Sequence, residues 1–172
     1  MTSEHPKPVY YAVSLRRLIL LSLISAGLYD LYWMYRNWKA IQKAEEREIL
    51  PFWRAFFGIF YCYPLFRHMV RSFRAHNHEV LYSPTWLAVL WVVLVILGKL
   101  STLPALGWFG YLVAIVSYLS FVALIPLQKT VNEYAEHTLN KELERKLSTG
   151  EFVIITLSAL VWVFFISVAL FA

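Results

Sequence analysis

The residues of this chain that could do chemistry are few, and the first is a carboxylate inside an apolar stretch. Asp30 lies in GLYDLYWMYRNWK, residues 27–39, where most neighbours are aromatic or aliphatic. A charge in apolar surroundings is costly unless it is paired. Arg54 opens the next apolar stretch after one short polar linker, and a guanidinium can bind a carboxylate through two parallel hydrogen bonds. We predict a structural ion pair between Asp30 and Arg54, against the alternative that each side chain reaches water alone.

Two further groups of residues could bind a metal ion or transfer protons. His76 and His78 are weak metal candidates, because residues two apart share a face on a strand but not on a helix, and no second ligand pair completes the set. Glu133 and His137 are four apart, a spacing that suits acid–base work but is more common on a solvated helix face. Cys62 has no basic neighbour that would activate its thiol. We predict no catalytic residue, no cofactor and no bound metal.

Composition places these residues in a membrane. Hydrophobic residues make up 59% of the 172 residues and charged residues 16%, against about 45–50% and about 25% in soluble domains. A soluble core of this size cannot bury that apolar excess. The net charge of +5 suits an anionic cytoplasmic leaflet, and the scattering of the basic residues disfavours a nucleic-acid partner. We predict an all-α integral membrane protein whose partners are membrane lipids.

Three apolar segments have the length of membrane-spanning helices. They cover residues 84–100, 108–127 and 152–172. The last has 21 residues without a charge, enough for a hydrocarbon core of about 30 Å. Ser148 and Glu151 form an S-x-x-E capping box just before it, which satisfies free N–H groups at a helix start.

Two aromatic segments nearer the N-terminus, residues 15–35 and 52–70, are either re-entrant or spanning. If both enter and return on the same side, the cytoplasmic side holds fifteen Lys and Arg residues and the other side holds only Lys99. The split is ten to six if all five segments span and twelve to four if the second alone fails to span. Because basic residues favour the cytoplasmic side, two re-entrant segments are preferred, with the N-terminus cytoplasmic and the C-terminus outside.

The whole chain, residues 1–172, is predicted to be a single membrane domain. Residues 1–14 form a short polar tail. Residues 128–147 are predicted as a cytoplasmic amphipathic helix that continues the preceding apolar segment, because Val131, Tyr134 and Ala135 follow helical spacing.

An aromatic stripe accompanies Asp30. Tyr29, Tyr32, Trp33 and Arg36 follow the i, i+3, i+4, i+7 spacing of one helix face. Tyr and Trp most simply anchor a helix at the lipid headgroups, so we predict an interfacial aromatic stripe. A groove for a lipid or cofactor is the alternative.

Parts of the chain resemble a family of small bacterial multi-pass inner-membrane proteins that carry a domain of unknown function. The element G-[LI]-Y-x-x-Y-W-x-Y-[RK]-N-W of that family is matched by residues 27–38, and F-W-R-A-F-F by residues 52–57. VNEYAEHTLNK and STGEFVIITLSALVW are also similar to it. The resemblance implies a bacterial inner-membrane location and supplies no activity.

Together these features predict a non-enzymatic inner-membrane accessory or scaffold protein that engages lipid, a larger membrane complex or further copies of itself. An oligomeric transporter or channel component, with Asp30 and Arg54 in a polar path, is the alternative. A third possibility is an enzyme that acts on lipids through Glu133, His137 or the region of His76.

Overall fold

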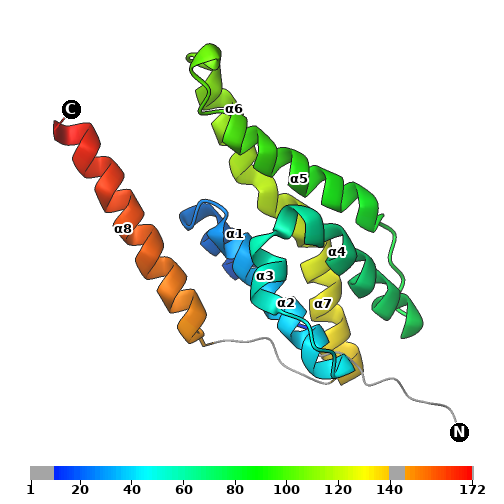
Figure 1. Ribbon diagram of the computed structural model, residues 1–172. Coiled ribbons are helices and arrows are strands. Elements are labelled where there is room, and N and C mark those ends of the chain that lie inside the picture. The colour runs from blue at the N-terminus through cyan, green and yellow to red at the C-terminus, as the bar shows by residue number, and fades with distance from the viewer. Residues whose placement is uncertain (1–9, 140–145, 172) are drawn as a thin grey trace, which may run out of the picture.

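The computed structural model describes residues 10–139 and 146–171, and all regular elements within these residues are helices (Figure 1). The α-helices are α1 (Leu15–Ile24), α2 (Leu28–Glu45), α3 (Pro51–Phe56), α4 (Gly58–Ala75), α5 (Pro84–Leu100), α6 (Phe109–Ser117), α7 (Ile125–Leu139) and α8 (Thr149–Phe171). Two short 3-10 helices, η1 (Pro104–Leu106) and η2 (Tyr118–Leu124), complete the set. The predicted all-α class is therefore confirmed.

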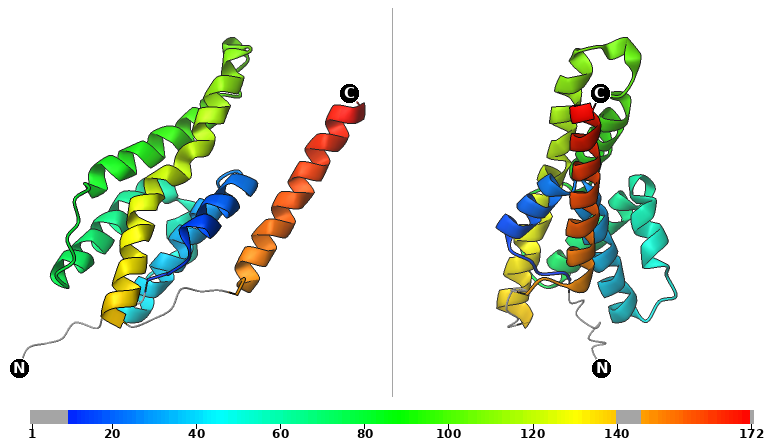
Figure 2. Two further views of the ribbon diagram at one scale, coloured as in Figure 1. Left: turned by 180° about the vertical axis from the view of Figure 1, so that it is seen from behind. Right: turned by 90° about the vertical axis from the view of Figure 1, so that its left-hand side faces the viewer.

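The two aromatic N-terminal segments each form two helices with a turn between them. α1 ends at a turn in which Ala26 and Gly27 have φ angles of +50° and +87°, a region that glycine enters at no steric cost. α2 then runs back toward the end of the molecule at which α1 begins (Figures 1 and 2). α3 and α4 are likewise separated by Phe57, whose φ and ψ of −88° and 39° are not helical. The turn between α1 and α2 is level with the middle of α8, because Trp162 Nε1 donates to the carbonyl oxygen of Ile24 (3.0 Å).

The second half of the chain forms a long hairpin and a separate helix. α5 packs along α6 and η2, and residues 101–108 join α5 to α6 at the far end, which we call the hairpin tip (Figure 2). α7 continues this arm between α1 and α4, and α8 contacts α1 and α2. α2, α4 and α7 all end at the opposite end of the molecule, which we call the basic end (Figure 1).

The number of membrane-spanning helices predicted from the sequence is not supported. Within the described residues, one helical run is long and apolar enough to cross a membrane, Phe109–Glu136, with 28 residues. α5 matches the predicted bounds 84–100 but has only 17 residues, about 25 Å of rise. For α8, the apolar stretch whose side chains are described is Thr149–Phe164, which is also short.

The predicted polar tail is wrong for residues 10–13, which belong to the core. Tyr10, Tyr11, Ala12 and Val13 are each at most 3% exposed. The backbone of this extended segment is held by side-chain amides: Tyr11 N–H donates to Asn37 Oδ1 (3.1 Å), and Asn132 Nδ2 donates to the carbonyl oxygen of Val13 (3.0 Å). These amides satisfy backbone groups of a buried segment that has no regular secondary structure. Residues 1–9 of the predicted tail lie outside the described residues.

α7 confirms that a helix continues out of the fourth apolar segment, as far as Leu139. Val131, Tyr134 and Ala135 are buried, as their helical spacing predicts. The remainder of the predicted helix falls largely on residues 140–145, outside the described residues.

Candidate functional site

The Asp30 carboxylate is buried where four helices meet. Its side chain is in the first turn of α2, and the residue is 1% exposed. Ser22 Oγ of α1 donates to Oδ1 (2.7 Å), while Trp91 Nε1 of α5 (3.1 Å) and Ser120 Oγ of η2 (2.7 Å) donate to Oδ2. Three donors from three other helices therefore replace the water that a carboxylate would otherwise bind.

The sequence places Asp30 at this point through the turn before it. Gly27 takes the left-handed conformation, and α2 starts at the next residue. Asp30 then lies in the first turn of α2, where the helix dipole favours an acidic residue. Gly58 lets α4 approach closely, since a Cβ there would lie 3.1 Å from the Trp91 ring. Close packing of this kind brings the indole N–H within reach of the carboxylate.

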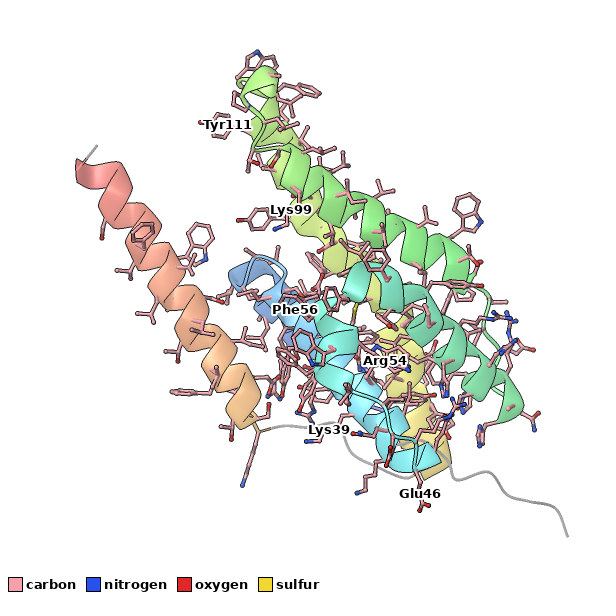
Figure 3. All side chains as sticks on the ribbon, viewed as in Figure 1. Lys39, Glu46, Arg54, Phe56, Lys99 and Tyr111 are labelled. Atoms are coloured by element: carbon pink, nitrogen blue, oxygen red, sulfur yellow. The ribbon has the colours of Figure 1, made fainter. Side chains whose placement is uncertain are left out.

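The predicted ion pair between Asp30 and Arg54 is not formed. The Arg54 guanidinium lies over the Trp38 ring, 4.5 Å from its centroid, and near Tyr61. Trp38 is eight residues beyond Asp30, about 12 Å further along α2. Because α3 starts at the other end of α2, Arg54 meets the second half of that helix and not its first turn (Figure 3).

A small pocket lies beside the Asp30 carboxylate. Its volume is about 310 Å³, and it is bounded by the α1–α2 turn, α5 and η2. Lys99 lines it from α5, and Ser117 and Tyr118 line it from the opposite arm of the hairpin. A polar path through Asp30 would therefore involve Lys99, which Figure 3 places near the hairpin tip, in place of the predicted Arg54.

The predicted aromatic stripe faces the protein core and not the headgroups. Tyr29 and Trp33 have no exposed surface, and Tyr32 and Arg36 are half-buried. Polar atoms of the stripe have partners inside the fold: the Trp33 indole donates to Gln128, and Arg36 Nη1 donates to Tyr32 Oη (2.8 Å). A helix face with the same spacing serves equally as a core face, which the periodicity alone cannot distinguish.

A second buried carboxylate, Glu151, was predicted only as a helix cap. The cap itself is confirmed, since Ser148 N–H donates to Glu151 Oε2 (2.8 Å) and Glu151 N–H donates to Ser148 Oγ (3.3 Å). Glu151 also accepts hydrogen bonds from Tyr11 (2.8 Å) and Tyr29 (3.0 Å), and it forms an ion pair with Arg17. The carboxylate therefore joins the first turn of α8 to the N-terminal segment, α1 and α2.

Tyr32 and Gly150 complete this junction. Tyr32 Oη lies 2.7 Å from Ser148 Oγ, and the ring lies against the backbone of Gly150. A Cβ at Gly150 would be 2.5 Å from Tyr32 Cε2, closer than side-chain atoms approach. Only glycine allows the ring and the start of α8 to come this near.

The Gly150→Ala variant is expected to lose about 1–3 kcal/mol of stability, because the added methyl group forces the Tyr32 ring away and breaks its contact with Ser148. Thermal unfolding of the purified protein in a mild detergent measures this. In the double variant Gly150→Ala/Tyr32→Ala the ring is absent. Its loss of stability should therefore be smaller than the sum of the losses in the two single variants. Strictly additive losses would contradict the close contact.

The weak metal candidates pack against an aromatic ring. The rings of His76 and His78 lie 5.5 and 5.4 Å from the Tyr134 ring, and His76 Nδ1 donates to the carbonyl oxygen of Ser72 (2.8 Å). Among the described residues, no three His, Cys, Asp or Glu side chains are grouped as a metal site requires. Glu133 faces Lys129 at 4.0 Å on the exposed side of α7, and the side chain of His137 lies outside the described residues.

The chain was compared with protein-family models, curated proteins and solved structures, and none of the three comparisons found a match. The resemblance to the bacterial inner-membrane family therefore stays a prediction from its motifs.

Proposed function

We propose that this protein is a non-enzymatic scaffold of the bacterial cytoplasmic membrane whose two N-terminal helical hairpins lie within one leaflet and engage lipid. The observation that carries the proposal is the size and position of its exposed apolar side chains. Around α3 and the start of α4, five aromatic side chains are 46–75% exposed: Phe52, Trp53, Phe56, Phe57 and Phe60. An apolar surface of this kind is costly in water and is stabilised in a bilayer.

Helix length supports hairpins that enter and return. α1 has 10 residues and α3 has 6, which correspond to rises of about 15 and 9 Å. A hydrocarbon core is about 30 Å thick, so neither helix could cross it alone. The turn after α1 lies level with the middle of α8, a depth that suits a hairpin reaching the bilayer centre.

Aromatic residues at both ends of the α5–α6 hairpin support its placement across the membrane. Trp86 near the start of α5 is 74% exposed, and Trp108 and Tyr111 near the hairpin tip are 74% and 76% exposed. Amphipathic rings of this kind concentrate at the two membrane–water interfaces. Figure 3 shows Tyr111 at the tip and Lys39 and Glu46 at the basic end.

The proposed orientation predicts which positions a membrane-impermeant maleimide can reach. In a Cys62→Ser background, a cysteine at Thr102 in the hairpin tip should react from outside intact cells, whereas cysteines at Glu46 and Glu79 should react only after permeabilisation. All three residues are exposed, so accessibility differs only by side of the membrane. Labelling of Glu46→Cys from outside would overturn the re-entrant arrangement. Equal labelling of all three variants in a soluble fraction would overturn the membrane location.

A transport role is the second candidate, and one observation favours it: the pocket of about 310 Å³ lined by Asp30 and Lys99. The scaffold role is preferred because Asp30 is 1% exposed and already accepts three hydrogen bonds. A proton or cation flux in proteoliposomes that is lost in Asp30→Asn would reverse this preference.

A further inference from the structure

A groove lies at the basic end, between the last turns of α2 and one face of α4. Its volume is about 1070 Å³. Four cationic side chains line it: Lys43, Arg47, Arg67 and Arg71. Two carboxylates, Glu45 and Glu46, line it as well, so its balance is positive even with neutral histidines.

One of these carboxylates, Glu45, already has partners within the protein. Glu45 Oε1 accepts a hydrogen bond from His68 Nε2 (2.5 Å), and Arg47 Nη1 lies 3.2 Å from Glu45 Oε2. Tyr10 Oη lies 3.3 Å from His68 Nδ1. Burial raises the pKa of the Tyr10 hydroxyl well above its ordinary value, so Tyr10 keeps its proton and can donate it to Nδ1, which leaves the Nε2 proton for Glu45.

The other cations of the groove are available to a ligand. Lys43, Arg67 and Arg71 are exposed, and within the ranges 10–139 and 146–171 no carboxylate pairs with any of them. Arg67 and Arg71 are one turn apart on the same face of α4, with Cβ atoms about 6 Å apart. Two guanidinium groups at this spacing can bind two oxygens of one phosphate group. They can also bind one oxygen of a phosphate group and one oxygen of the glycerol group linked to it.

α4 changes character along its length, and the groove lies across the change. The exposed residues of its first half are apolar, such as Ile59, Phe60 and Tyr63. The second half carries Arg67 and Arg71, which line the groove. Tyr63 and Pro64 form the apolar end of the groove, and His76 marks its polar end. A ligand that fills the groove therefore needs an anionic part and an apolar part.

We propose that this groove binds the headgroup of an anionic phospholipid of the cytoplasmic leaflet. Arg67 and Arg71 bind the phosphate oxygens, Lys43 adds a third positive charge from α2, and the first part of an acyl chain lies against Tyr63 and Pro64. The inference rests on the proposed membrane location and names the lipid class that the scaffold engages. A soluble phosphate compound would use the same arginines but would leave the apolar end unfilled.

The test uses the full-length protein in a mild neutral detergent, titrated separately with short-chain phosphatidylglycerol, short-chain phosphatidylcholine and inorganic phosphate, with binding followed by native mass spectrometry. We expect phosphatidylglycerol to bind most tightly. The Arg67→Gln/Arg71→Gln variant should weaken that binding by about tenfold or more, because a hydrogen bond to a charged group contributes at least the factor of ten that about 1.4 kcal/mol represents. The Arg16→Gln/Lys39→Gln variant removes the same charge from exposed residues outside the groove and should change binding less than about threefold.

Three outcomes would overturn the proposal: equal binding by the Arg67→Gln/Arg71→Gln variant and the wild type, an equal loss in the control variant, or inorganic phosphate binding as tightly as phosphatidylglycerol. A thermal unfolding scan of each variant without lipid shows that the fold is intact. Failure here leaves the maleimide labelling pattern unchanged, so it is distinguishable from failure of the proposed membrane location.

Discussion

The Glu151→Gln variant is expected to unfold at a temperature about 6–12 °C lower than the wild type. Glu151 is completely buried and accepts hydrogen bonds from Tyr11, Tyr29 and the Ser148 cap while it pairs with Arg17. The glutamine amide removes the negative charge that pairs with Arg17. It also replaces one carboxylate oxygen, an acceptor, by an NH2 group, a donor that then faces other donors. Breaking a buried pair costs about 3 kcal/mol or more, and a chain of this size loses about 2–4 °C per kcal/mol.

Thermal unfolding in a mild detergent measures the effect, and Glu136→Gln is the matched control because Glu136 is exposed on α7. Tyr11→Phe should lower the unfolding temperature in the wild-type background but by less in the Glu151→Gln background, since its hydroxyl then has lost its carboxylate partner. A Glu151→Gln variant as stable as the Glu136→Gln control would show that the junction of α8 with α1 and α2 does not hold the fold.

The Asp30→Ala variant is expected to lose about 3–5 kcal/mol. The change leaves three buried donors, Ser22, Ser120 and the Trp91 indole, without their acceptor. An unsatisfied buried donor costs about 1–3 kcal/mol. The triple variant Asp30→Ala/Ser22→Ala/Ser120→Ala should lose less than the sum of its parts, because two of the orphaned hydroxyls are gone.

Arg54 provides the discriminating measurement for Asp30. Arg54→Ala removes a guanidinium that lies on Trp38 and should cost only about 0.5–2 kcal/mol. Its effect should add to that of Asp30→Ala within about 0.5 kcal/mol, because the two side chains share no partner. A coupling above about 1 kcal/mol would restore the ion pair that the sequence predicted.

Much of the fold could be predicted from the sequence where local signals act alone. Ser83-Pro84 starts α5 and the S-x-x-E box starts α8, because caps and prolines act within a single turn. Gly27 interrupts an apolar run, and the chain turns there. Pro64, in contrast, lies inside α4, and the break falls at Phe57, just before Gly58.

The partners of the buried polar groups could not be predicted, because they depend on which helices meet. Asp30 was expected to need a cation, yet two serines and an indole satisfy it. Ser22 and Ser120 look unremarkable in apolar segments, and the sequence offers no sign that both face one carboxylate. The amides of Asn37, Gln128 and Asn132 were the available signal for the buried segment 10–13, since amides in predicted helices near apolar residues often hold an irregular backbone.

The hydrogen bonds of Asp30 also constrain the order in which the chain can fold during its synthesis. Its donors lie 8, 61 and 90 residues away along the sequence. As the ribosome releases the first hairpin, only Ser22 is available, and the carboxylate must stay near water or carry a proton until Trp91 and Ser120 have been made. In the proposed membrane location, the α1–α2 hairpin would therefore reach its final depth in the bilayer only after synthesis has passed η2.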